Sequence, residues 1–255
     1  MNIMNFRVAT ILSLFLSIGL QVSAFDFSEG EPEMQWKTLL DAYRLDAPGT
    51  ASMLRRYADM YPAGMHANEA RLKIADISFY RHDWPEALAA YNRADIKGLS
   101  GPDRALYSYR KALCMIKSGF YKEARAELKN VKGRGFSDVR KFYTAYCDYI
   151  EGDMDSALKG FMSVTPGIKD LPAGYYIVQI LYMKGDYRQV VNTADNMMFK
   201  DPVPELCPEI HRVNGLSFFK LDEYDLARQA LINYLDQNKG EVNSEALYAM
   251  GVIEY

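Results

Sequence analysis

The chain has 255 residues, of which 49% are hydrophobic and 25% are charged, a composition typical of a folded protein and not of a disordered one. Its formal net charge of −3 leaves no surplus of basic residues to neutralise phosphates, so nucleic acid is not the expected partner. Three cysteines are too few for a disulfide scaffold, and we expect buried thiols at Cys114 and Cys147.

The first 24 residues have the features of a secretion signal. Arg7 precedes an apolar run from Val8 to Leu20, and Val22-Ser23-Ala24 supplies small residues at the positions that signal peptidase inspects. The run covers 13 residues, whereas a membrane-spanning helix needs about 20. We therefore expect cleavage after Ala24 and an exported protein, periplasmic or secreted. Membrane association would arise only through an uncleaved signal, which is the alternative, or through a partner.

The predicted helices begin after a short linker over 25–34. Gln35 to Arg44 and Ala51 to Tyr61 have helical periodicity, and Asp46-Ala47-Pro48-Gly49 separates them. We interpret 35–65 as an atypical N-terminal helix pair.

From residue 66 onward the chain repeats one short phrase. A Gly, Asp or His, which we call the turn residue, is followed two positions later by a large residue. A small residue then stands three positions after the large one. The large residues are Trp84, Tyr121, Met154, Tyr187 and Tyr224, which gives steps of 37, 33, 33 and 37 residues. Such a period is typical of repeat architectures.

Each phrase predicts a turn between two helices. Asp83, Asp153 and Asp186 are placed to cap the second helix, and Asp83 with Glu86 has the spacing of a capping box. The small residue after each turn is expected to let the two helices approach closely, and the residue seven before each turn residue belongs to the helical period of the preceding segment. These positions are Ala75, Ala112, Ala145, Val178 and Gly215 before the turns, and Ala87, Ala124, Ala157, Val190 and Ala227 after them.

These features resemble the tetratricopeptide repeat (TPR) family over about Glu33 to Tyr255. The matching residues are Leu247, Met250-Gly251 and Tyr255 in a first helix, Gly185-Asp186-Tyr187 at a turn, and Tyr224, Ala227 and Leu231 in a second helix. The resemblance implies an all-α, right-handed superhelical solenoid of antiparallel helix pairs. Residues 66–255 would hold about five repeats and an unfinished last helix from Ser244, and we expect no sheet.

Residues with catalytic or metal-binding patterns are scarce. His66, His82 and His211 are scattered, and no metal-ligand pair, phosphate-binding glycine loop or nucleophile elbow is present in the sequence. We expect no enzyme activity, no metal and no cofactor.

Aromatic residues on the first helices are the candidate binding site. In the family that the chain resembles, the first helices line the concave face, and large aromatic surfaces with a hydrogen-bonding tip suit protein recognition. The expected partner is therefore a protein or peptide held by a scaffold, although helix packing is the competing interpretation of any single ring. Two alternatives stay open, a surface protein that binds glycan or peptide nutrients and a recognition module of a longer enzyme or sensor continuing past Tyr255. The candidate partner-binding residues are Tyr109, Phe142, Tyr146, Tyr149, Tyr175 and Tyr182.

Overall fold

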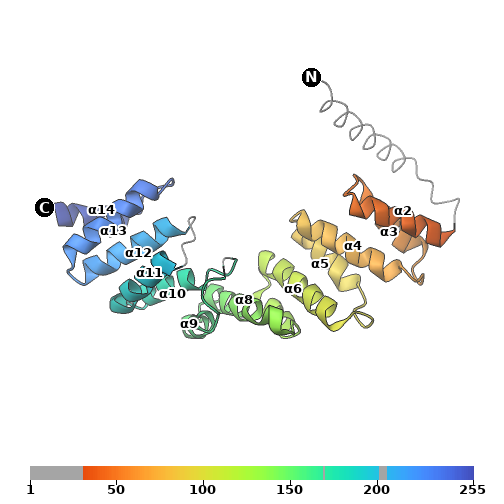
Figure 1. The fold of residues 1–255 in the computed structure, drawn as a ribbon, viewed down its shortest axis with the longest axis horizontal. Coiled ribbons are helices and arrows are strands. Elements are labelled where there is room, and N and C mark those ends of the chain that lie inside the picture. The colour runs from red at the N-terminus through yellow and green to blue at the C-terminus, as the bar shows by residue number, and fades with distance from the viewer. Residues whose placement is uncertain (1–30, 169, 201–205) are drawn as a thin grey trace, which may run out of the picture. The chain divides into compact units, whose positions relative to one another are not determined.

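The computed structural model describes residues 31–168, 170–200 and 206–255. The predicted signal over 1–24 lies outside these ranges. Every regular element within them is a helix, which confirms the all-α prediction for this part of the chain (Figure 1). The contacts divide the chain into two compact units, up to Phe120 and from Tyr121 onward, which we describe separately.

Unit 1 consists of consecutive helices that pack on their neighbours in sequence. They are α2 (Pro32–Arg44), α3 (Thr50–Met60), α4 (Ala67–Tyr80), α5 (Trp84–Arg93) and α6 (Gly101–Lys117). The first helix begins three residues before the predicted start at Gln35, because Pro32 occupies a first-turn position where its missing N–H costs nothing. Its buried face, with Trp36 and Leu39, joins Leu54 and Tyr57 of α3 in one core.

Unit 2 continues the same arrangement. It contains α7 (Tyr121–Leu128), the 3-10 helix η1 (Arg134–Phe136), α8 (Ser137–Ile150), α9 (Met154–Met162), α10 (Ala173–Met183), α11 (Tyr187–Lys200), α12 (Cys207–Lys220), α13 (Tyr224–Gln237) and α14 (Ser244–Glu254). The densest pairing is between α12 and α13, which lie side by side in Figure 1, and the next is between α8 and α9.

The five repeated turns share one backbone geometry. At each turn the second residue after the end of the first helix has a positive φ, between 60° and 85°. The next N–H then donates to the carbonyl five residues earlier, for example Asp153 N to Asp148 O at 2.9 Å and Glu223 N to Phe218 O at 3.0 Å. This pattern is the Schellman motif, which explains why the turn residue is mostly glycine. The turn residues are His82, Gly119, Gly152, Gly185 and Asp222.

The predicted caps are only partly as expected. The side chains of Asp83 and Asp153 accept the backbone N–H groups of Glu86 and Ser156 at 3.2 and 3.1 Å, as predicted. The capping box at Asp83 was wrong in its second half, because the Glu86 carboxylate accepts a bond from Arg55 of α3 instead. The carboxylate of Asp186 accepts a hydrogen bond from the side chain of Gln189, and not from a backbone N–H group as a cap would.

The small residues before and after the repeated turns are buried. The alanine or valine after each turn is fully buried, at 0% exposed, and the residues seven before the turn residues, apart from Gly215, are at most 1% exposed. At Gly215 an added Cβ would lie 2.8 Å from Leu231 Cγ. The helices α12 and α13 therefore approach so closely that only a small side chain fits between them at this position.

Candidate functional site

The aromatic residues of unit 2 gather around a single ring, that of Tyr176 on α10. Its centroid lies 4.8 Å from that of Phe161 on α9, with the rings stacked at 9°. Four further rings pack on it at larger angles, mostly edge-on, at centroid distances between 5.2 and 5.8 Å. They belong to Phe142, Tyr146 and Tyr149 of α8 and to Tyr175 of α10.

The depth of these rings differs. Phe142 is 4% exposed and Phe161 is fully buried, so both are core residues. Burial raises the pKa of the Tyr176 hydroxyl to about 12. Tyr176 is nevertheless partly exposed, as are Tyr146, Tyr149 and Tyr175, which pack around it. The arrangement is an aromatic base, made of the buried Phe142 and Phe161 and the half-buried Tyr176, that supports three tyrosines at the surface.

The three outer tyrosines have hydroxyl groups available to a ligand. Within the described ranges, no hydrogen bond involves the hydroxyl of Tyr146, Tyr149 or Tyr175, whereas Tyr91 and Tyr107 in unit 1 donate to Asp76 and to a backbone carbonyl. Burial is the main cause of a raised pKa at Tyr146 and Tyr175, so both are neutral donors at neutral pH. We call Tyr146, Tyr149 and Tyr175 the tyrosine surface.

The other predicted residues lie elsewhere. The ring of Tyr182 contacts that of Tyr187 at 5.6 Å, and burial and the nearby carboxylate of Glu245 raise the pKa of its hydroxyl, so this residue is engaged within the structure. Tyr109 is a partly exposed residue of α6 in unit 1. The structure therefore brings together four of the six predicted residues, and it places Phe142 among them as a core residue.

Unit 1 holds a polar network that the sequence patterns did not indicate. Arg110 of α6 donates to Asp76 of α4 at 2.6 Å and to the Tyr80 hydroxyl at 2.6 Å, and Tyr91 donates to the same carboxylate at 2.8 Å. The guanidinium also lies 5.1 Å from the centre of the Tyr80 ring. Because these bonds join residues of α4, α5 and α6, the network is a structural feature of unit 1.

Comparison with known proteins rests on structure alone. No family model matches the sequence, and no curated protein matches it. Solved structures match with probability 1.00. YrrB, described as a TPR protein with an unusual peptide-binding site, has a TM-score of 0.56 at 14% identity, over 76% of this chain and 96% of that one.

Two further structures agree. A crystal structure of MamA has a TM-score of 0.53 at 14% identity, covering 64% of this chain and 94% of that chain. The C-terminal part of a TPR repeat-containing protein from Cytophaga hutchinsonii has a TM-score of 0.55 at 16% identity, covering 66% and 65%. The chain has the TPR fold. The fold class and the resemblance predicted from the sequence are thus confirmed.

In this TPR fold the tyrosine surface lies on first helices, α8 and α10, as the resemblance implied. Among the described residues, no group of three or more His, Cys, Asp or Glu side chains is placed to hold a metal ion. None of the helices in the described ranges has the length and apolar character needed to cross a membrane.

Proposed function

We propose that the chain is an exported, non-enzymatic TPR adaptor that binds a protein or peptide partner through the tyrosine surface. Three partly exposed tyrosines with unused hydroxyls, packed on the half-buried ring of Tyr176, are the observation that supports this proposal. Nucleic acid is not part of the proposal, and membrane association would arise only through an uncleaved signal or a partner.

The packing of these rings suits recognition. Tyr176 holds the rings of Tyr146 and Tyr149 at 5.7 and 5.3 Å, so part of their conformational freedom is already lost before a partner binds. Tyrosine offers a large apolar face and a polar tip, which is the combination enriched at binding hot spots. YrrB is described as having a peptide-binding site, and this supports a peptide or protein as the class of partner for the same fold.

Photo-crosslinking identifies the partner without removing the rings. Tyr149 is replaced by p-benzoyl-phenylalanine in the full chain in its native cells, and Tyr224 is replaced in parallel as a control. Tyr224 is 45% exposed and lies at the α12–α13 turn, away from the tyrosine surface. We expect a discrete crosslinked protein at Tyr149 that is missing at Tyr224, and equal crosslinking at both positions would contradict the proposal.

Affinity for the purified partner then tests the side chains. The triple variant Tyr146→Phe, Tyr149→Phe, Tyr175→Phe keeps the packing and removes only the hydroxyls, so helicity and melting temperature should not change. We expect binding to weaken by about tenfold or more, since each lost hydrogen bond is typically worth about 1 kcal/mol. Tyr224→Phe is the matched control, and unchanged affinity in both the triple variant and a Tyr149→Ala, Tyr175→Ala variant would overturn the assignment of the surface.

Export is tested separately by the mass of the protein recovered from the native cells. Loss of the first 24 residues and recovery outside the cytoplasm are the expected results, and an intact N-terminus in the cytoplasm would contradict this part of the proposal.

A further inference from the structure

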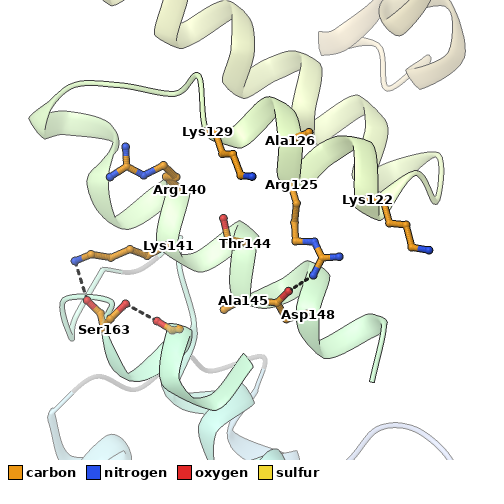
Figure 2. A pocket seen from close by; sticks show the side chains of 11 residues that line it. Lys122, Arg125, Ala126, Lys129, Arg140, Lys141, Thr144, Ala145, Asp148 and Ser163 are labelled. Carbon is orange, nitrogen blue, oxygen red and sulfur yellow. Dashed lines mark hydrogen bonds and ion pairs between the residues drawn. The ribbon is translucent and has the colours of Figure 1, made fainter. Parts of the chain in front are cut away.

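A second surface of unit 2 is a basic groove between α7, α8 and α9. It has a volume of about 690 Å³. Figure 2 shows cationic side chains from α7 and the segment after it on one side, and those of α8 on the other. The cations that line the groove are Lys122, Arg125, Lys129, Arg140 and Lys141, and Asp148 is the one acidic residue of the lining.

The charge of this segment differs from that of the whole chain. Residues 122–141 contain seven Lys or Arg and three Asp or Glu, in a protein whose formal net charge is −3. The positive charge is therefore concentrated at the groove. A local field of this kind attracts an anionic partner and raises its association rate.

Part of this charge is already neutralised within the structure. Arg125 pairs with Asp148 and with Glu151, the latter at 2.6 Å. Lys141 lies 3.0 Å from Asp138 and donates to the Ser163 carbonyl at 2.8 Å. These bonds fix the positions of the inner cations and the shape of the groove.

Two outer cations remain available. Lys122 and Lys129 are exposed, and neither makes an ion pair with any of the residues that the structure describes. Lys122 is the second residue of α7 and Lys129 directly follows its last residue, so the two are about 10 Å apart along the helix axis. In an extended polyproline-type peptide, residues three apart lie on one side at about 9 Å, which is a close match.

The floor of the groove is formed by residues with small side chains or none. Ala126, Ala145 and Gly160 contribute little side-chain volume, and Figure 2 shows the Thr144 hydroxyl directed into the space between α7 and α8. A peptide backbone can approach such a floor, and the threonine offers it a hydrogen bond.

We propose that this groove binds an extended acidic segment of a protein, rich in Asp and Glu. The available cations are lysines, whose ammonium groups act as point charges that suit single carboxylates. The guanidinium groups that favour bidentate phosphate binding are engaged at Asp148 and, at 3.1 Å, at the Val131 carbonyl. The negative charge of the rest of the chain disfavours a long polyanion such as nucleic acid.

This site is separate from the tyrosine surface and does not depend on it. The groove uses Lys141, Thr144 and Asp148 of α8, whereas Phe142, Tyr146 and Tyr149 turn toward Tyr176 on a different face of the same helix. Two partners, or two parts of one partner, can therefore occupy unit 2 independently.

The test measures binding of a labelled peptide to the full chain by fluorescence anisotropy. The peptide consists of Asp-Pro-Ser repeats, which place carboxylates three residues apart. The double variant Lys122→Ala, Lys129→Ala should weaken binding on the order of tenfold, and wild-type affinity should fall with added salt. Lys159→Ala with Lys239→Ala removes the same charge at two exposed lysines outside the groove and should leave affinity nearly unchanged. Thr144→Tyr, which fills the groove without changing its charge, should also weaken binding.

The remaining outcomes each overturn the proposal. An equal loss in both lysine pairs would show a general effect of charge, and unchanged binding in Thr144→Tyr would place the peptide outside the groove. An Asn-Pro-Ser peptide that binds as well would exclude carboxylate recognition. Binding of a phosphoserine peptide or of single-stranded oligothymidine without binding of the acidic peptide would assign the groove to phosphate or to nucleic acid.

Discussion

A Cβ atom added at Gly160 of α9 would lie 2.7 Å from the Cβ atom of Ala145 on α8, closer than two such atoms can approach. The neighbour is a helix backbone and its first side-chain atom, so neither can move aside without shifting the helix. We predict that Gly160→Ala lowers the free energy of unfolding by about 1–3 kcal/mol, as overpacking typically does. Denaturant titration followed by circular dichroism measures this difference.

Gly251→Ala is the matched control for this experiment. Gly251 lies inside α14, and an added Cβ there meets no atom within 4 Å. The substitution should therefore be neutral or stabilise by about 0.5–1 kcal/mol, since alanine has the higher helix propensity. Similar losses in both variants would show that the α8–α9 contact is not as tight as the structure indicates.

The base of the tyrosine surface should be important for stability. We predict that Tyr176→Ala destabilises the protein by about 2–4 kcal/mol, because the ring contacts those of five other aromatic residues, including the fully buried Phe161. Tyr176→Phe keeps these contacts and should unfold at nearly the wild-type denaturant concentration. If Tyr176→Ala unfolds like the wild type, the ring is not a structural support and must be considered a binding residue itself.

Acid should weaken the turn before α9. The pKa of Asp153 lies below its ordinary value because Ser156 donates hydrogen bonds from its side chain and from its backbone N–H. A carboxylate whose pKa is lower in the folded state stabilises above its unfolded pKa of about 4, and that contribution disappears as the pH falls through the folded value. We predict that Asp153→Asn, which keeps the accepting oxygen but does not titrate, loses less melting temperature below pH 4 than the wild type.

Asp236→Asn is the comparison for the acid experiment. Asp236 is an exposed carboxylate of α13 that makes no hydrogen bond or ion pair with other described residues. The melting temperature of this variant should match that of the wild type at every pH. An equal change in both variants would show that the acid sensitivity does not arise from the Asp153 cap.

The cysteines should differ sharply in reactivity. Cys114 and Cys147 are fully buried, and burial raises the pKa of each thiol to about 12, whereas Cys207 is partly exposed. None of the three forms a disulfide in the described ranges. We predict that iodoacetamide at pH 8 modifies Cys207 first, measured by mass spectrometry of tryptic peptides, and modifies the other two only in denaturant. Early labelling of Cys114 or Cys147 in the native protein would contradict the packing.

The repeated turns could be predicted because their causes are local. Each turn depends on three residues within one helix-turn-helix segment. These are a residue that adopts a positive φ, a capping carboxylate, and a small residue three positions after the large one. The Schellman bonds at Gly152 and the buried Ala157 follow from these residues alone. The pairing of Glu86 with Arg55 could not be predicted, since it joins helices about 30 residues apart in sequence.

The candidate site was predictable in part for the same reason. Periodicity selects the first-helix aromatics, but it does not give the rotation of α10 that turns Tyr176 onto Phe161 of α9, so the central ring was missed. The adjacent Tyr175-Tyr176 pair was the only sequence signal for it. The basic groove was missed because the net charge averages over the chain and conceals the excess of Lys and Arg within 122–141.

The packing of each helix mainly on its neighbours in sequence has a kinetic consequence. In unit 2 the principal contacts join consecutive helices or helices two apart, as with α10 and α12 or α12 and α14. Loops of this length close quickly, so the principal contacts among the described residues do not have to wait for a late closure step. Unit 2 should therefore fold rapidly from any of its helix pairs. Because α14 packs only sparsely on α12 and α13, its amide hydrogens should exchange before those of α8 and α12.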